Sequence, residues 1–165
     1  MIAGRVWKFG DNINTDLMVP GSVLRKDAAE QLKHVFSANR PGWVSKVRAG
    51  DVIIGGRNFG MGSSRPAARA LRNLKLQFLL AEQINGLFFR TCVNEGFLAL
   101  ECPGVEGAFE EGDTAQLSLE AWSVTNPRTG QDLQPLPVPA RLLKLMREGG
   151  IIPMLEAEGL IEPLA

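Results

Sequence analysis

The middle of the chain alternates between short apolar runs and longer segments with helical spacing, and this order restricts the possible folds more than any other feature. The apolar runs at 51–55, 76–81 and 97–101 have the length of buried strands. The intervening segments, 66–74 and 83–93, place apolar residues on one helical face. Strands that are joined through helices pair in parallel with right-handed crossovers. The order therefore predicts a β-α-β-α-β unit.

The flanking segments extend this unit into a mixed sheet. Residues 2–9 alternate as a strand, and residues 113–138 combine short alternating runs with a turn at 126–130, which is typical of antiparallel strands. Residues 139–148 have the pattern of a closing helix. We expect a single domain over residues 1–165 with an α/β fold, consisting of a mixed sheet, the β-α-β-α-β unit and a C-terminal β hairpin.

The sequence predicts the start of one helix and the buried face of another. Asp27 followed by Glu30 has the spacing of a capping box, which predicts a helix over 28–37. In the helix at 83–93, the spacing of the apolar residues turns Leu87 toward the core.

Charge and hydropathy exclude several classes of partner. The 165 residues carry 18 basic and 18 acidic side chains, so the formal net charge is zero. The basic residues are dispersed, so nothing favours binding to nucleic acid or to an acidic membrane surface. No apolar run approaches the roughly 20 residues that span a bilayer, and the N-terminus lacks the layout of a signal peptide. We expect a cytoplasmic protein with no nucleic-acid or membrane partner.

The two cysteines, Cys92 and Cys102, do not have the spacing of a paired-cysteine metal site. Each lies in an apolar stretch, where a free cysteine is typically a small buried hydrophobe. The only histidine, His34, is expected to be structural, which leaves no serine-hydrolase triad. We therefore expect no metal in this chain.

The glycine-rich loop at 59–66 is the strongest candidate for a ligand site. It reads Phe-Gly-Met-Gly-Ser-Ser-Arg-Pro, and Pro66 is suited to the first helical position. Gly60 and Gly62 let the backbone approach a ligand, and Arg65 can hold a carboxylate with two parallel hydrogen bonds. The N–H groups at the helix start also favour an anion. The alternative is an ordinary turn in which a serine caps the helix and the arginine faces water.

A second polar segment, residues 10–16, contains two aspartates, two asparagines and a threonine and is expected to be a loop. Its spacing does not match a calcium loop, which needs a glycine at the sixth position and a closing glutamate. Turn formation by the Asn and Asp side chains is one explanation of the segment. Convergence with the glycine-rich loop on a common site is the other.

Taken together, the two segments resemble the small subunit of 3-isopropylmalate dehydratase, which corresponds to the swivelling domain of aconitase. The resemblance rests on Gly-Asp-Asn-Ile-Asn-Thr-Asp at 10–16, on the Val-Pro at 19–20, and on Gly-Arg-Asn-Phe-Gly-Met-Gly-Ser-Ser-Arg at 56–65. It covers essentially the whole chain and continues through three shorter motifs: Ala-Glu at 81–82, Phe-Arg at 89–90 and Asn-Glu-Gly at 94–96.

The resemblance implies a hydro-lyase that moves a hydroxyl between adjacent carbons of a hydroxy polycarboxylate through an unsaturated intermediate. It implies that Ser63 is the base that removes the carbon-bound proton, and that Ser64 and Arg65 bind a substrate carboxylate. Thr15 and Asp16 match a second substrate-binding motif, in which the aspartate also orients active-site groups. A 4Fe-4S cluster is expected in a separate large subunit, where it acts as a Lewis acid, and no cofactor is expected in this chain.

Two departures from the family pattern bear on the substrate. Family members commonly continue Ser-Ser-Arg with Glu-His, whereas this chain has Pro66 and Ala67. Farther upstream, Val23 stands where an aromatic residue is common, and Arg25 resembles the arginine of homoaconitase-like members. An additional cation favours a substrate with a charged γ substituent over an isopropyl group. A solvent-facing Arg25 is the alternative.

The resemblance favours a 3-isopropylmalate dehydratase of leucine biosynthesis, which converts 2-isopropylmalate to 3-isopropylmalate. The small subunit of a homoaconitase, a methylaconitase or a dimethylmaleate hydratase is the alternative within the enzyme class. A non-catalytic anion-binding module that retains the fold is the alternative outside it.

Overall fold

A seven-stranded mixed sheet forms the centre of the computed structural model, which describes residues 1–163. In chain order the strands are β1 (Ile2–Lys8), β2 (Val52–Gly55), β3 (Leu79–Ala81), β4 (Ala99–Glu101), β5 (Thr114–Ser118), β6 (Ser123–Asn126) and β7 (Gln131–Leu133). Across the sheet their order is β4-β3-β2-β1-β5-β6-β7. The first four neighbours pair in parallel, and β5, β6 and β7 continue from β1 as antiparallel strands.

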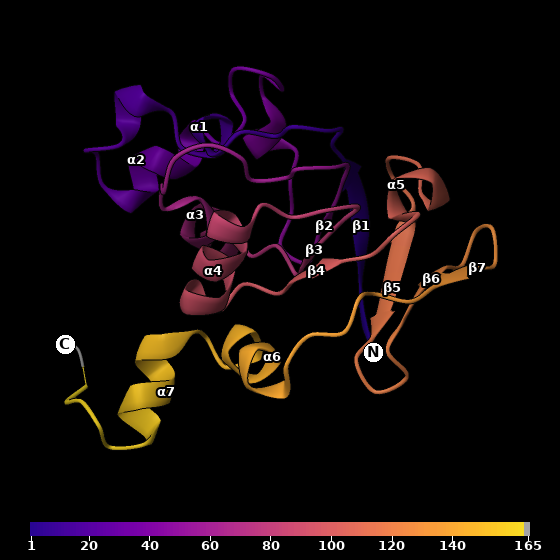
Figure 1. Cartoon of the computed structure of the whole chain (residues 1–165). Coiled ribbons are helices and arrows are strands. Elements are labelled where there is room, and N and C mark those ends of the chain that lie inside the picture. Colours follow the sequence, from indigo (N-terminus) through magenta and orange to yellow (C-terminus); the bar gives the residue numbers. More distant parts are fainter. Residues whose placement is uncertain (164–165) are drawn as a thin grey trace.

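Helices surround the sheet on several sides (Figure 1). Within residues 1–163 the α-helices are α1 (Thr15–Met18), α2 (Ala28–Lys33), α3 (Ala67–Asn73), α4 (Gly86–Glu95), α5 (Val105–Ala108), α6 (Ala140–Arg147) and α7 (Ile151–Ala157). Figure 1 shows α1 and α2 at one end of the molecule, α6 and α7 at the other, and α3 and α4 between them. None of these helices has the length and apolar character needed to cross a bilayer.

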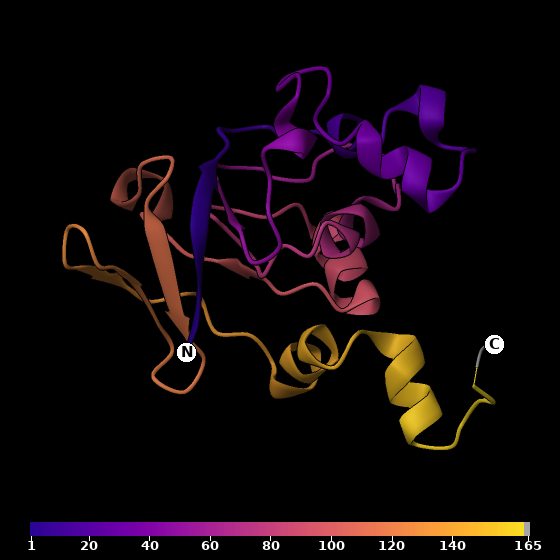
Figure 2. The ribbon, with the colours of Figure 1, turned by 180° about the vertical axis from the view of Figure 1, so that it is seen from behind.

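The β-α-β-α-β unit that the sequence predicts is confirmed as β2-α3-β3-α4-β4, with all three strands parallel. The antiparallel segment is confirmed as β5, β6 and β7, which lie on the side of β1 away from α3 and α4 (Figure 2). β3 and β4 begin later than the apolar runs at 76–81 and 97–101. Phe78 and Leu98, just before these strands, are nevertheless buried, and their carbonyl oxygens accept hydrogen bonds from the N–H groups of Ile53 and Leu79. Burial and backbone pairing therefore both begin before the strands do.

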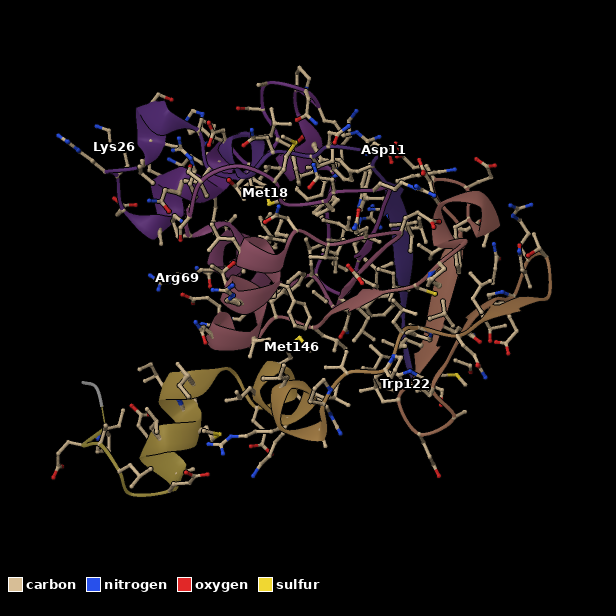
Figure 3. The ribbon with its side chains drawn as sticks, in the orientation of Figure 1. Asp11, Met18, Lys26, Arg69, Trp122 and Met146 are labelled. Carbon is tan, nitrogen blue, oxygen red and sulfur yellow. The ribbon has the colours of Figure 1, made fainter. Side chains whose placement is uncertain are left out.

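Each face of the sheet buries its own core, because successive strand residues point to opposite faces. Ile53 of β2 packs in the same core as Leu71 of α3 and Met18 of α1. Its neighbour Ile54 packs in the other core with Met146 of α6, which lies between α6 and α4 in Figure 3. The parallel strands are therefore covered on both sides, as parallel sheets generally are.

The end of α2 differs from the prediction. The helix begins as expected, because the Asp27 carboxylate accepts a hydrogen bond from the Glu30 N–H at 2.8 Å. It ends at Lys33 rather than at residue 37. Phe36 then adopts a left-handed φ of 56° and places its ring 4.4 Å from that of Phe9. Aromatic packing in the core therefore ends the helix before its apolar pattern ends.

The start of α4 also differs from the prediction. The chain is still extended at Ile84, which forms an isolated parallel bridge with Phe59. Asn85 then caps the helix by accepting a hydrogen bond from the Leu87 N–H at 3.1 Å. Leu87 consequently lies in the first turn with 40% of its surface exposed, so the expectation that it faces the core is wrong.

The sequence pattern does not predict α1, α5 or α7. The polar segment 10–16, which is expected to be a loop, ends in α1, because the Asn14 side chain caps a helix that begins at Thr15. Helix α7 follows Gly149 and Gly150, where the pattern predicts only an apolar tail, and it buries Met154 against the core. The closing helix at 139–148 agrees with α6 to within one residue at each end.

Asp113 is a carboxylate at the start of β5 that several donors hold in its charged form. It accepts hydrogen bonds from the Arg128 guanidinium at 2.6 and 2.9 Å, from the Glu110 N–H at 2.9 Å and from the Asn126 amide at 2.9 Å. These bonds, with Arg128 foremost, hold the pKa of Asp113 well below its usual range. The charged carboxylate therefore stabilises the folded state.

We expect Asp113→Asn to destabilise the fold at neutral pH and to have less effect in acid. A carboxyl group with a lowered folded-state pKa stabilises the fold above its unfolded-state pKa, about 3.9, and this contribution is lost as the pH falls toward the folded-state value. The urea midpoints of the wild type and the variant should differ at neutral pH and approach each other below about pH 4. A difference that does not change with pH would contradict this role of the charge.

Candidate active site

The two polar segments meet because β1 and β2 are parallel neighbours, so the chain leaves both strands at the same edge of the sheet. Asp11 marks this edge in Figure 3. Backbone hydrogen bonds continue the pairing beyond the strands, among them Gly56 N–H to Gly10 O at 3.2 Å, Asn12 N–H to Arg57 O at 2.8 Å and Gly60 N–H to Ile13 O at 2.8 Å. The segments therefore converge, which is one of the two explanations that the sequence leaves open.

Two glycines let the glycine-rich loop pass close to its neighbours. Gly60 and Gly62 have positive φ values of 81° and 105°. A β-carbon at Gly60 would lie 2.2 Å from the Phe88 ring, and one at Gly62 would lie 2.4 Å from the side-chain oxygen of Asn14. Any larger residue at either position would push the loop away from α4 or from α1.

Asp16, in the first turn of α1, contacts two polar side chains of the loop. Its Oδ1 accepts a hydrogen bond from Arg65 Nε at 2.5 Å, and the same oxygen lies 3.4 Å from Ser63 Oγ. The Asp16 N–H in turn donates to the Asn14 side chain at 2.8 Å, which fixes the start of α1. About half of the Asp16 side chain is exposed, so these groups lie at an open surface.

The guanidinium of Arg65 has one bound edge and one free edge. Its side chain is only 15% exposed, and Nη1 is buried without a hydrogen-bond partner among residues 1–163. Both Nη atoms lie 3.9 Å from the position that a β-carbon would take at Gly21. An arginine that faced water would not bury a nitrogen, so that alternative is wrong. The free edge fits a carboxylate, which accepts two parallel N–H bonds.

The two serines of the loop do not serve as helix caps. Pro66 is the N-cap residue of α3, one position before the first helical position that the sequence predicts for it. No side chain caps this helix, so the alternative in which a serine does so is also wrong. Ser63 and Ser64 are exposed, and their hydroxyl groups are open to a ligand.

Thr15 is placed differently from the other residues of the site. It is only 3% exposed, and its hydroxyl donates a hydrogen bond to the Ser63 carbonyl oxygen at 2.8 Å. Its N–H donates to the Met61 carbonyl oxygen, also at 2.8 Å. Thr15 therefore faces the backbone of the loop and not the open surface.

Arg25 lies in the turn between a short 3-10 helix, Gly21–Val23, and α2. Its side chain is exposed and has no hydrogen-bond or ion-pair partner in the described part of the chain. The Gln31 amide donates to the carbonyl oxygens of Leu24 and Lys26 at 3.1 and 3.0 Å, which fixes the turn on both sides of Arg25. The Lys26 side chain projects away from the body of the molecule (Figure 3).

Residues 1–163 contain no group of three or more His, Cys, Asp or Glu side chains that could hold a metal ion. Cys92 and Cys102 are free and buried, as the apolar context predicts. Burial raises the pKa of the Cys102 thiol to about 12 and that of Cys92 still further. Because thiolates are the form that binds metals, these cysteines do not fit as ligands of an iron–sulfur cluster.

Asn14 and Gln31 support the site, although motif comparison does not assign them a role. Asn14 both caps α1 and packs against Gly62. Its signal in the sequence is an asparagine two residues before an acidic residue, which is typical of a helix start. The helix is too short to show an apolar period, so this signal is easily taken for a turn. Gln31 has no comparable signal, because its partners are backbone oxygens in a separate turn.

Known proteins are similar to this chain in sequence and in fold. Residues 12–104, which include the glycine-rich loop and residues 12–16 of the other polar segment, match the aconitase C-terminal domain family. The chain is similar to the 3-isopropylmalate dehydratase small subunit 1 of Methanopyrus kandleri, with 38% identity over 161 residues that cover 96% of this chain and 95% of the relative. It is also 36% identical over 154 residues to the methanogen homoaconitase small subunit of Methanothermobacter thermautotrophicus, covering 92% and 89% of the two chains.

A solved structure agrees with the architecture as well. The crystal structure of 3-isopropylmalate dehydratase from Methanocaldococcus jannaschii superposes with a TM-score of 0.89 at 28% identity, and the match covers 98% of this chain and 96% of that one. The α/β fold class that the sequence predicts is therefore confirmed. With its matched domain, its near-complete coverage of these relatives and its mixed sheet, the chain belongs to the family of 3-isopropylmalate dehydratase small subunits.

Proposed function

We propose that this chain is the small subunit of a two-subunit hydro-lyase that converts 2-isopropylmalate to 3-isopropylmalate in leucine biosynthesis. One observation carries the proposal: Asp16 Oδ1 contacts both Ser63 and Arg65 while the other edge of the Arg65 guanidinium is free. A candidate base and a carboxylate-binding group are thus held side by side. Because this site is open at the surface, a separate large subunit would complete it.

Arg65 would bind a carboxylate of the substrate through its Nη atoms, which Asp16 leaves free by holding Nε. Ser64 lies beside it on the exposed part of the loop and would contribute its hydroxyl. Asp16 would orient both groups. A carboxylate fixed in this way is aligned before the reaction, and such alignment lowers the barrier by restricting the motion of the reacting groups.

Ser63 would remove the carbon-bound proton in the dehydration and return it in the rehydration. When the C–H bond breaks, its electron pair forms the double bond as hydroxide leaves the adjacent carbon. A serine is a poor base unless its alkoxide is stabilised. The N–H groups of residues 62–65 have no partner within residues 1–163, and together with Arg65 they would stabilise that charge.

We place the 4Fe-4S cluster on the large subunit, because the buried cysteines of this chain do not fit as its ligands. When bound, such a cluster supplies Lewis acidity to the leaving hydroxyl. Balanced basic and acidic residues give no reason to expect a nucleic-acid or membrane-surface partner. A cytoplasmic location and a single domain over residues 1–165 stay predictions.

We expect Ser63→Ala to lower kcat by about 10²- to 10⁴-fold, the usual contribution of a general base. The chain would be co-expressed with its large subunit under anaerobic conditions, and the absorbance of the unsaturated product would report turnover. Ser118→Ala is the matched control, since it removes a serine hydroxyl from β5 on the far side of β1.

Gel filtration would check that both variants still bind the large subunit. Wild-type activity in the Ser63→Ala complex would remove Ser63 from the role of base. A wild-type complex that turns over none of 2-isopropylmalate, 3-isopropylmalate, homocitrate and dimethylmaleate derivatives would instead favour a non-catalytic anion-binding module.

Homoaconitase-type activity is a second candidate, and Arg25 is the observation that favours it. This cation is exposed and unpaired within residues 1–163, and Gly21 of the adjoining 3-10 helix lies against Arg65. A substrate with a carboxylate in place of the isopropyl group would find a partner in Arg25. Methylaconitase and dimethylmaleate hydratase activities are further alternatives of the same reaction type.

We expect Arg25→Ala to lower kcat/KM for homocitrate by about 10- to 100-fold, the effect of losing one hydrogen bond to a charged group, and to leave kcat/KM for isopropylmalate nearly unchanged. Lys26→Ala is the matched control, because Lys26 is the neighbouring exposed cation. The ratio of kcat/KM for homocitrate to kcat/KM for isopropylmalate decides the outcome. If Arg25→Ala changes this ratio no more than Lys26→Ala does, Arg25 faces solvent and does not select the substrate.

A further inference from the structure

The backbone around the candidate base is held at a single point. Within residues 1–163, the peptide groups of residues 62–65 make one hydrogen bond, which the Thr15 hydroxyl donates to the Ser63 carbonyl oxygen at 2.8 Å. The loop before this stretch is paired with the polar segment 10–16, and α3 begins after it. Ser63 thus lies in the least supported part of its loop, and Thr15 supplies its support.

Thr15 is itself fixed on several sides. It is almost completely buried, and its β-branched side chain restricts χ1. Its N–H bonds the Met61 carbonyl oxygen, so Thr15 grips the loop both before and after Gly62. Asn14 caps the helix that Thr15 begins, and its side-chain oxygen occupies the space that a β-carbon at Gly62 would need. The hydroxyl of Thr15 is therefore presented from a rigid element.

We infer that Thr15 is a positioning residue for Ser63 and does not contact the substrate. Its hydroxyl fixes the peptide of Ser63, and this peptide determines where the Ser63 Oγ lies relative to Asp16 and the free edge of Arg65. The inference rests on the proposed role of Ser63 as the base. It also replaces the expectation, drawn from motif resemblance, that Thr15 takes part in substrate binding.

The test uses a substitution that removes only the hydroxyl. Thr15→Val keeps the branched shape and the N–H that bonds Met61, but it leaves the Ser63 carbonyl without its partner. Thr15→Ser restores the hydroxyl without the methyl group. Thr91→Val is the matched control, because the half-buried Thr91 hydroxyl makes the same type of bond to the Phe88 carbonyl, at 2.7 Å, within α4.

In the complex with the large subunit, Thr15→Val should lower kcat by about 10- to 100-fold, because small displacements of a reacting group reduce rates on this scale. KM should stay within about threefold of the wild-type value. In Thr15→Ser, kcat should return to within about threefold of the wild-type value. Thr91→Val should leave both constants unchanged. A raised KM at constant kcat would show that Thr15 binds substrate, and a kcat loss no greater than that of Thr91→Val would overturn the inference.

A second measurement on the full chain alone does not depend on activity. NMR relaxation should give the Ser63 and Ser64 amides order parameters of about 0.85 in the wild type and in Thr15→Ser, and values below about 0.6 in Thr15→Val. Equal values in the wild type and Thr15→Val, or a wild-type loop that is already mobile, would overturn the inference. If the wild-type complex turns over no substrate, the proposed function fails, and this measurement alone decides the role of Thr15.

Discussion

The parallel pairing of β1 with β2 is the constraint on which the candidate site depends. Lys8 lies opposite Ile54 at the end of this pair, so the two polar segments leave the sheet together. Shifting the register by one residue would reverse the face of every side chain in the strand. Because β2 is buried on both faces, with a different core on each, such a shift is costly, and packing of the cores fixes the alignment of the two loops.

Once the loops are aligned, Asp16 organises the groups between them. An ion pair whose carboxylate is half exposed contributes little to stability. The contact between Asp16 and Arg65 matters because it orients the guanidinium group. It holds Nε and leaves the Nη atoms free at the point where Ser63 is within reach of the same carboxylate oxygen. Thr15, one residue before Asp16, fixes the backbone of Ser63. Two adjacent residues of α1 thus set both the side chains and the main chain of the loop.

Sequence periodicity is sufficient where burial follows the apolar pattern of the element itself, continuous in strands that are buried on both faces and one-sided in helices, which is why the β-α-β-α-β unit is predicted correctly. It fails where a distant contact decides the outcome. The aromatic partners of Phe36 end α2 early, and the bridge at Ile84 delays α4 and exposes Leu87. The site follows the same rule: its polar residues are recognisable along the chain, but the inward direction of Thr15 depends on a bond to a residue 48 positions away.

The most direct test of the account is the crystal structure of the chain with its large subunit and a bound hydroxy-acid inhibitor that cannot be dehydrated. We predict that a carboxylate of the inhibitor accepts hydrogen bonds from the Nη atoms of Arg65, that Asp16 still holds Nε, and that Ser63 Oγ faces the carbon that would lose its proton. An inhibitor bound with Ser63 and Arg65 turned away from it would contradict the claim that these two loops form one half of the active site.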